Sequence, residues 1–468
     1  MSAAVETAQG HTRAVAEFVT RTAFQQIPSS AVAAARDAIL DSVGVALAGS
    51  REPAGYIGAD LARDEGAREE ASVFGHGFQT SSTTAAFANG VSVHALDYDS
   101  SFAIMGQPMA GLVPAAFALA EPARTTGRQL LEAYVVGYEV TGKLARSMPP
   151  RSGEGDWHAT GTLGSLGCAA ASARLLGLDV NRTCMALGIA ASMASGIVAN
   201  FGTMSKPLHA GLAARNGVLA ARLAQRGFTG NPLMLEGAGG FFGAFAGGAD
   251  LKPLEDLGST FEIERGVRFK FYPCGGLTHS AVDAVLALRG EHAFEPGEIE
   301  RIDVKVTPYT ANRIVFKVPA TGLQGKFCMP YILARAVLDG GLTPDTFTDE
   351  AIREPAVLAL AEKVHMEGDP QLENDATGGR PSQVWIRLTD GRSFYRQVDF
   401  PRGSLQAPLS AEELRGKFGS CARRALSEAA ASEALALLDS LETLDDVAPL
   451  GRLLSGDAQV AAAVSRNA

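Results

Sequence analysis

The sequence predicts a mainly α protein: a large all-helical domain built from both chain ends, with a smaller α+β domain inserted between them. Apolar residues recur at helical spacing from residue 11 to about residue 260, where no convincing strand pattern interrupts them. Strand-like alternation begins only in the segment 266–402, and helical patterning of the first kind returns in 403–468. We therefore expect 1–265 and 403–468 to pack together as one domain.

Capping residues mark the helices of the first part. Ser29 and Ser30 precede an apolar helix that Gly49 ends. Ser81 caps another apolar helix, which runs into a cluster of His94, Asp97 and Asp99. His94 and Asp97 are three positions apart, so they share a helix face.

One stretch, 204–242, reads MSKPLHAGLAARNGVLAARLAQRGFTGNPLMLEGAGGFF and begins a helix with Lys206 and His209 in its first turns. The many Ala and Gly residues allow a second helix to approach closely, which favours a buried helix. Burial would lower the pKa of Lys206 and suit it to be a base or an anion ligand. The alternative is an ordinary surface lysine on a loop before the helix.

Three segments of the inserted domain alternate apolar and polar residues. EIERIDVKV (298–306), QVWIRLT (383–389) and FYRQV (394–398) are predicted strands, and the turn at 390–391 joins the last two as a hairpin. A helix is expected over 325–339.

Composition limits the possible functions. The 468 residues carry a formal net charge of −10, which argues against non-specific nucleic-acid binding. No apolar run is long enough to span a membrane, and the N-terminus lacks the apolar core of a signal peptide. The five cysteines are scattered, which fits a reducing cytoplasm. We expect a cytoplasmic protein without nucleic-acid or membrane partners.

No metal and no cofactor is predicted. The eight histidines form no HExxH or HxH cluster, and the cysteines form no CxxC pair. The glycine-rich stretch 237–248 follows no strand, so it matches a dinucleotide-binding fingerprint poorly. The sequence also contains no P-loop and no GxSxG nucleophile elbow. NAD and ATP are therefore not expected.

Acid, base and cationic groups lie beside predicted helix ends and glycine-rich loops, at Asp97, Asp99, His158, Lys206, His279 and Tyr331. Such a set provides general acid–base groups and an anion site. His158 lies in the loop RSGEGDWHATGT (151–162), and loops often carry functional groups. The alternative is a loop histidine with only structural partners.

Seven stretches carry a family resemblance in the family's order and cover nearly the whole chain: FANGVSVHALDYD, HATGTLGSLGCAAASARLLGL, KPLHAGLAARNGVLAARLAQRGFTG, KFYPCGGLTHSAVDAVLAL, GKFCMPYILARAVLDG, DGRSFYRQVDFPRGS and ELRGKF. They resemble the MmgE/PrpD family, which includes 2-methylcitrate dehydratase, cis-aconitate decarboxylase and iminodisuccinate epimerase. The resemblance implies a homodimer in which the α+β domain is a lid. It also implies an active site between the domains that needs no cofactor in the decarboxylase and epimerase branches.

The resemblance assigns roles residue by residue. Asp97 is similar to the first aspartate of the family's D-F-D-D-T run, and Ser101 to its threonine. His158 resembles the histidine before the T-G-T turn, and His279 the histidine of the T-H pair. Lys206 resembles the active-site lysine and Tyr331 the tyrosine of the lid helix. Ser205 and Lys270 are expected to join Ser101 in binding substrate.

The chain departs from the family pattern at Gln107. The family run usually reaches a His-Pro pair about ten residues after the first aspartate, and that histidine is a leading candidate for the acid or base. Here the pair is Gln107–Pro108, and the second aspartate of the D-D pair is Ser100. Glutamine does not titrate, so Gln107 is expected to bind substrate and other residues must move the proton.

Three functions stay open. A lyase (dehydratase or decarboxylase) acting on a small di- or tricarboxylate is favoured by the activities found across the family. An epimerase or isomerase is favoured by Gln107, because removing and returning a proton needs only two groups. A non-catalytic binding protein is disfavoured, because the other pocket groups are retained.

Overall fold

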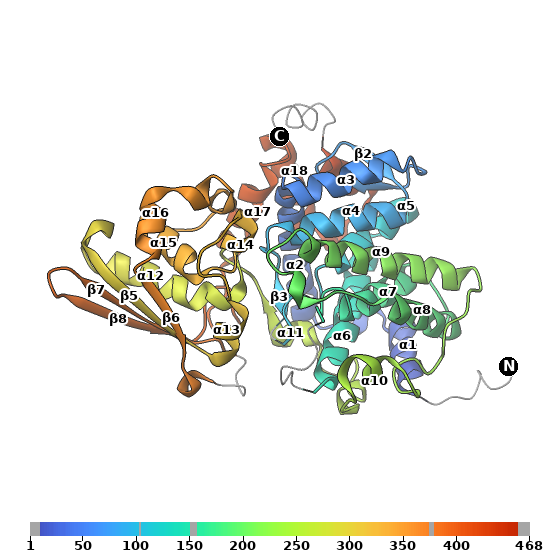
Figure 1. Cartoon of the computed structure of the whole chain (residues 1–468). Helices are drawn as coiled ribbons and strands as arrows, with labels where there is room; N and C mark the ends of the chain where they lie inside the picture. Colours follow the sequence, from blue (N-terminus) through green and yellow to red (C-terminus); the bar gives the residue numbers. More distant parts are fainter. Residues whose placement is uncertain (1–9, 103, 150–156, 374–378, 457–468) are drawn as a thin grey trace.

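The structure is a computed structural model that describes residues 10–102, 104–149, 157–373 and 379–456. It consists of a larger helical body and a smaller α+β body (Figure 1). Each body has its own hydrophobic core. The predicted fold class, mainly α with a helical part made from both chain ends and a smaller α+β part, is confirmed.

The helical body takes most of its helices from the first half of the chain: α1 (His11–Arg21), α2 (Ser29–Gly49), α3 (Pro53–Asp64), α4 (Ser82–Ala95), α5 (Leu112–Ala123), α6 (Gly127–Ser147), α7 (Leu163–Leu175), α8 (Val180–Met193), α9 (Ser205–Gln225), α10 (Phe241–Ala246) and α11 (Glu262–Gly266). The C-terminal part adds α17 (Ala411–Ala422), α18 (Glu428–Asp439) and α19 (Ala448–Ser455). Phe418 of α17 packs against Gly44 of α2, so both chain ends share one core.

The α+β body contains a four-stranded sheet in the order β6 (Val364–Gly368), β5 (Ile299–Val306), β7 (Ser382–Leu388), β8 (Ser393–Val398). Strand β5 pairs parallel with β6 and antiparallel with β7, and β7 and β8 form the predicted hairpin. Its helices are α12 (His279–Glu291), α13 (Pro308–Arg313), α14 (Gly322–Gly325), α15 (Met329–Asp339) and α16 (Pro355–Ala361). The three predicted strands are confirmed. Strand β6 was not predicted. Only one of its residues, Val364, is buried, so its sequence shows no alternation of apolar and polar residues.

Short strands also occur in the first part of the chain, where the sequence shows no convincing strand periodicity. β1 (Ala71–Val73) pairs with β2 (Phe78–Thr80), and β3 (Ser101–Phe102) pairs with β4 (Val267–Arg268). Strands this short leave no periodic pattern in a sequence. The β3–β4 pair joins the chain after α4 to the segment that enters the α+β body.

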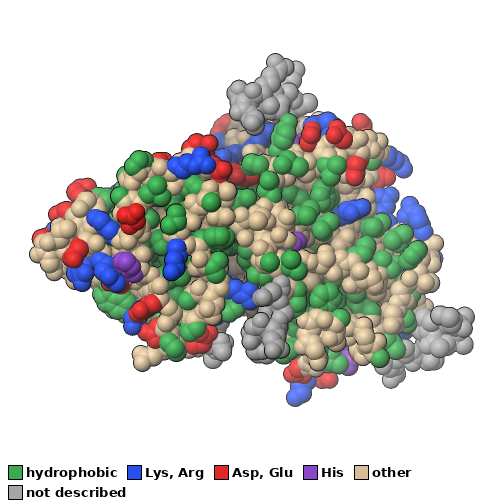
Figure 2. All heavy atoms as spheres, viewed as in Figure 1, with side chains coloured by type: hydrophobic (Ala, Val, Ile, Leu, Met, Phe, Trp, Pro, Cys, Tyr) green, Lys and Arg blue, Asp and Glu red, His purple; other side chains and the backbone are tan. Residues whose placement is uncertain are grey.

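Val267 belongs to the core of the helical body and Tyr272 to that of the α+β body. The predicted domain limits at 265/266 and 402/403 stay predictions. On the face shown in Figure 2, most charged side chains lie on the outer margins of the two bodies, and the middle is largely apolar or uncharged. Within the described residues, no helix is long and apolar enough to cross a membrane.

Helices α4 and α9 pack closely because glycines lie at their contact. Gly90 of α4 lies against the backbone of Ala210 and Gly211, and Gly211 of α9 lies against Val91 and the backbone of Phe87. The predicted close approach of a second helix to α9 is thus confirmed. It places the C-terminal end of α4 beside the N-terminal end of α9.

A methyl group at Gly211 would lie 2.6 Å from Val91 Cγ2 and 2.7 Å from the Phe87 carbonyl oxygen. Gly211→Ala is therefore expected to push the two helices apart and to lower the free energy of unfolding by about 1–3 kcal/mol, measured by denaturant unfolding. The control is Gly243→Ala in α10, where an added methyl meets no atom within 4 Å. Equal stability of the two variants would contradict this account of the helix contact.

Candidate active site

Helix α4 ends at Ala95 and is followed by the Asp97 loop, residues 96–99. Asp97 has a φ of 51°, in the left-handed region that few residues other than glycine adopt. Such a conformation persists only where the surrounding structure holds it. The loop is therefore fixed by its contacts and not by its own backbone preference.

Three buried lysines from distant parts of the chain hold the carbonyl groups of residues 96–98. Lys326, at the end of α14, donates to the carbonyl of residue 96 at 3.0 Å. Lys270, just after β4, donates to that of residue 97 at 2.8 Å. Lys417 of α17 donates to that of residue 98 at 2.8 Å. Three consecutive carbonyls thus each accept a hydrogen bond from a different segment.

All three lysines make further buried contacts. Lys326 also donates to the Pro273 carbonyl at 3.1 Å. The Lys417 ammonium lies 2.7 Å from Asp41 of α2 and also donates to the Lys270 carbonyl at 2.9 Å. The Lys270 ammonium lies 2.8 Å from Asp97 Oδ1. The C-terminal helix α17, the helical core and the segment after β4 are therefore joined at this loop.

Lys206, in the first turn of α9, lies at the centre of the cluster and is 4% exposed. Its Nζ atom lies 2.9 Å from Asp97 Oδ1 and 2.7 Å from His94 Nε2. The rings of Phe201 and Phe327 face the ammonium at 5.3 and 5.8 Å, a favourable cation–π arrangement. The alternative of a surface lysine is excluded. Burial lowers the pKa of Lys206, and the Asp97 carboxylate opposes this shift.

Asp97 is the shared acceptor of the cluster. Its Oδ1 atom lies within 3.0 Å of Lys206 Nζ, Lys270 Nζ and Gln107 Nε2. Burial alone would raise the pKa of Asp97, but the two ammonium groups outweigh it and hold that pKa well below its usual range. Asp97 is consequently ionised and serves as the counter-ion of both lysines.

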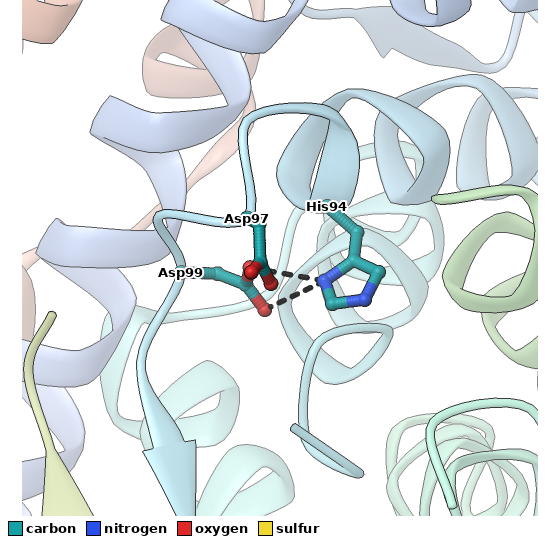
Figure 3. Close-up of side chains that lie close together, drawn as sticks. All are labelled: His94, Asp97 and Asp99. Carbon is teal, nitrogen blue, oxygen red and sulfur yellow. Dashed lines mark hydrogen bonds and ion pairs between the residues drawn. The ribbon is translucent and has the colours of Figure 1, made fainter. Parts of the chain in front are cut away.

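His94 connects Lys206 to a second carboxylate. His94 Nδ1 lies 3.0 and 3.1 Å from the two oxygens of Asp99, which point toward the ring (Figure 3). A carboxylate only accepts hydrogen bonds, so Nδ1 carries the hydrogen and Nε2 turns a lone pair to Lys206. Burial lowers the pKa of His94, and Asp99 opposes this shift.

His94, Asp97 and Asp99 bring potential metal ligand atoms within 4.8 Å of one another. Each of these side chains already has a partner. Two ammonium groups lie on Asp97, and His94 bonds to both Asp99 and Lys206. A cation bound here would have to displace them, so the residues fit an ion-paired network better than a metal site.

Gln107 is buried and bridges both carboxylates, because its amide nitrogen lies 3.0 Å from Asp97 Oδ1 and 3.2 Å from Asp99 Oδ1. Thr160 Oγ1 donates to the backbone carbonyl of Gln107 at 2.9 Å and lies 3.1 Å from His158 Nε2. The single hydroxyl hydrogen of Thr160 is used in the bond to Gln107. In the contact between Thr160 and His158, the hydrogen must therefore be on His158 Nε2, which donates it to Thr160 Oγ1.

His158 Nδ1 lies 2.9 Å from His209 Nδ1, so His209 donates to His158. Burial lowers the pKa of His158 well below its usual range and that of His209 to about 4. Both rings are therefore neutral near pH 7. His158 thus has the side-chain partners expected of a histidine with only a structural role. Its ring is also stacked on that of His94, with 5.7 Å between the ring centroids. Residues 151–156 of its loop lie outside the described residues.

The remaining predicted residues are placed differently. His279 begins α12, its ring packs edge-on against Tyr272 at 5.2 Å, and its buried Nε2 has no hydrogen-bond partner among the described residues. Burial lowers the pKa of His279 to about 3. Ser101 lies in β3 opposite Arg268. Ser205 is the first residue of α9, where its backbone NH bonds to the Thr203 hydroxyl.

Tyr331 lies in the core of the α+β body. Its hydroxyl donates to the Thr346 carbonyl and accepts from Arg335 Nε at 3.2 Å. The structure therefore brings Asp97, Lys206 and Lys270 into direct contact but gives Tyr331 other partners. The roles predicted for all the site residues, including Tyr331, His279, Ser101 and Ser205, stay predictions.

The predicted site lacks His94, Lys326 and Lys417. A signal existed for His94, which lies three positions before Asp97 in the sequence. The predicted shared helix face is wrong, because α4 ends at Ala95 and Asp97 lies in the loop that follows. Lys326 and Lys417 lie in the stretches GKFCMPYILARAVLDG and ELRGKF. Nothing in those stretches indicates their contacts with the Asp97 loop, which span 230 and 319 residues. Only the folded chain reveals them.

Comparison with known proteins establishes the family. Residues 13–254 match the MmgE/PrpD N-terminal domain, and residues 272–443 match the MmgE/PrpD C-terminal domain. The chain therefore belongs to the MmgE/PrpD family, as the resemblance implied.

Relatives of the chain include several enzymes. Cis-aconitate decarboxylase of Mus musculus is 32% identical over 437 residues, which cover 89% of this chain and 88% of that protein. The Homo sapiens enzyme of the same name is 31% identical, with 89% of each chain covered. The Aspergillus terreus enzyme of that name is 29% identical, with 95% of this chain and 96% of that protein covered.

Lys417→Met leaves the buried carboxylate of Asp41 without its cation, so it is expected to lower the free energy of unfolding by about 3–5 kcal/mol. The double variant Lys417→Met/Asp41→Asn removes the unpaired charge and should recover part of that loss in denaturant unfolding. Arg387→Met, which breaks a half-exposed pair with Glu300, is the control and should change stability by less than about 1 kcal/mol. A double variant no more stable than Lys417→Met would refute the pairing.

Proposed function

We propose that this chain is a cofactor-independent lyase that removes a carboxyl group from a small unsaturated tricarboxylate of the cis-aconitate type. The observation that carries the proposal is the buried pair of Lys206 and Asp97, reached by His94 and Lys270. The relatives named as cis-aconitate decarboxylases support the reaction class, because they match the chain over nearly its whole length. The expected homodimer and cytoplasmic location are part of this proposal.

The charge of the cluster suits a polyanionic substrate. Four buried lysines face three buried aspartates around the Asp97 loop: Lys206, Lys270, Lys326 and Lys417 against Asp41, Asp97 and Asp99. With the histidines neutral, these buried side chains carry one more positive than negative charge, and the half-buried carboxylate of Glu52 also acts on Lys326. A buried excess cation favours binding of an anion, and exclusion of water strengthens that attraction.

Decarboxylation breaks the bond between a carbon atom and its carboxylate, and the electron pair stays on the carbon skeleton. A neighbouring carboxylate and double bond spread this charge, and a proton must then be added to carbon. The tricarboxylate and one proton thus become a dicarboxylate and carbon dioxide. The Lys206 ammonium is the proton donor in this scheme, and the enzyme regains its proton from solvent.

Gln107 cannot supply that proton. Its amide hydrogens hold Asp97 and Asp99, and its predicted role in binding substrate stays a prediction. The same residue favours the second candidate, an epimerase or isomerase. That reaction also uses proton transfer next to a carboxylate, but no group leaves. A dehydratase differs from the decarboxylase in losing water.

Proton NMR in deuterated water, with cis-aconitate, citrate, 2-methylcitrate and iminodisuccinate as separate substrates, distinguishes these reactions. We expect cis-aconitate to be consumed and a decarboxylated product to appear that carries one deuterium at carbon. Deuterium incorporation without loss of a group would instead establish the isomerase. An alkene formed from 2-methylcitrate would establish the dehydratase, and binding of all four without turnover would establish a binding protein.

Lys206→Ala is expected to lower kcat by at least about 1,000-fold, because it removes the proton donor and a cation of the site. Initial rates at saturating substrate measure the effect, and thermal unfolding checks the fold. Arg226→Ala, at the exposed C-cap that follows the same helix, is the matched control and should keep the wild-type rate. Full turnover by Lys206→Ala would refute the site.

A further inference from the structure

The contacts of His94 are unusual for a buried structural histidine. Each of its two ring nitrogens bonds to a side chain that carries charge, Asp99 on one side and Lys206 on the other. A histidine that only needed satisfied nitrogens would be served by backbone carbonyls or hydroxyls. Hydrogen bonds instead join three titratable side chains in a row, from Asp99 through His94 to Lys206.

We propose that His94, oriented by Asp99, is a positioning residue that exchanges a proton with Lys206 and so sets the charge state of that lysine during turnover. The inference rests on the proposed function, in which Lys206 gives a proton to carbon. It assigns a role to two residues, His94 and Asp99, that act on the reaction only through Lys206.

The proton step is balanced within the cluster. A hydrogen of the Lys206 ammonium moves 2.7 Å along the existing hydrogen bond to His94 Nε2. One N–H bond at Nζ breaks and one at Nε2 forms, so a neutral amine and an imidazolium replace an ammonium and an imidazole. The reverse step restores the ammonium. No other reactant is needed.

The two aspartates make both states tolerable in a buried site. In the first state the ammonium of Lys206 lies beside Asp97 at 2.9 Å. In the second state the imidazolium of His94 lies beside Asp99 at 3.0 Å. Neither state leaves a buried positive charge without a carboxylate, which is the main cost of moving charge inside a protein. The pattern resembles the aspartate–histidine pair that orients and stabilises the base of a serine hydrolase.

Other charged or titratable groups act on this pair from every neighbouring element: Asp97, Lys270, His158 and His209. Burial lowers the pKa of both Lys206 and His94, whereas Asp99 raises the pKa of each by stabilising the protonated form. Replacing Asp99 by a neutral residue therefore lowers the pKa of both groups. The site loses its proton at a lower pH.

Asp99→Asn is the first test, because it keeps the shape of the side chain. An asparagine amide can donate to His94 Nδ1 as well as accept from it. The ring hydrogen of His94 can then lie on Nε2, where it points at the Lys206 ammonium and can no longer accept its hydrogen bond. We expect kcat on the accepted substrate to fall at least about 10-fold with little change in KM. The alkaline limb of the kcat profile should move to lower pH.

His94→Gln is the second test, because glutamine accepts a hydrogen bond from Lys206 but cannot take its proton. It should reproduce the fall in kcat. His76→Gln replaces another buried histidine, beside Arg63 and Tyr56, and should leave kcat and its pH profile unchanged. Wild-type kcat and pH profile in both site variants would overturn the proposal.

A measurement without substrate separates this proposal from the proposed function. In protein labelled with ¹⁵N-histidine, the His94 signal, assigned by its loss in His94→Gln, should show hydrogen on Nδ1 and a bare Nε2. The ¹³Cε shift of Lys206 should titrate at a lower pH in Asp99→Asn than in the wild type. Hydrogen on Nε2, or a Lys206 titration that does not shift in Asp99→Asn, would refute the proton exchange between His94 and Lys206, even if the enzyme converts its substrate. The expected spectra in a protein without decarboxylase activity would refute only the proposed reaction.

Discussion

A carboxylate buried away from water is unstable unless cations surround it, and Asp97 meets this condition with two lysines on one oxygen atom. Its backbone adopts a left-handed conformation that depends on hydrogen bonds to the carbonyls around it. Much of the architecture serves this requirement. Helix α9 brings Lys206, the segment after β4 brings Lys270, and α17 from the C-terminal part of the chain brings Lys417.

The amide at position 107 fits into the same balance of charge. Its two hydrogens reach both Asp97 and Asp99 and add no charge of their own. A protonated histidine there would add a further cation to a cluster that already has an excess of lysines. A neutral amide instead lets both aspartates keep their charges, one for Lys206 and one for His94. The replacement is therefore compatible with a working acid–base site centred on the lysine.

Local patterns predicted much of this structure because helices and strands are encoded over a few neighbouring residues. Ser81 caps α4 as predicted, the hairpin of β7 and β8 turns at 390–391, and the small residues of α9 do bury Lys206. Features that depend on distant partners left no such pattern. The two-residue pairing of β3 with β4 and the contacts of Lys326 and Lys417 arise only when remote segments meet. The family resemblance could name Asp97 and Lys206, but not the contacts by which Lys326 and Lys417 hold the loop.

The order of these contacts along the chain has a consequence for biosynthesis. A nascent chain that has emerged as far as α9 already contains His94, Asp97, Asp99 and Lys206, but not the three lysines that fix the loop. The last of them, Lys417, lies 319 residues beyond the carbonyl that it holds. Long-range contacts of this kind form late, after the segments between them have folded. The acid–base groups are therefore assembled into their final geometry only after Lys417 has emerged from the ribosome, and a ribosome-bound fragment that ends before this residue lacks that geometry.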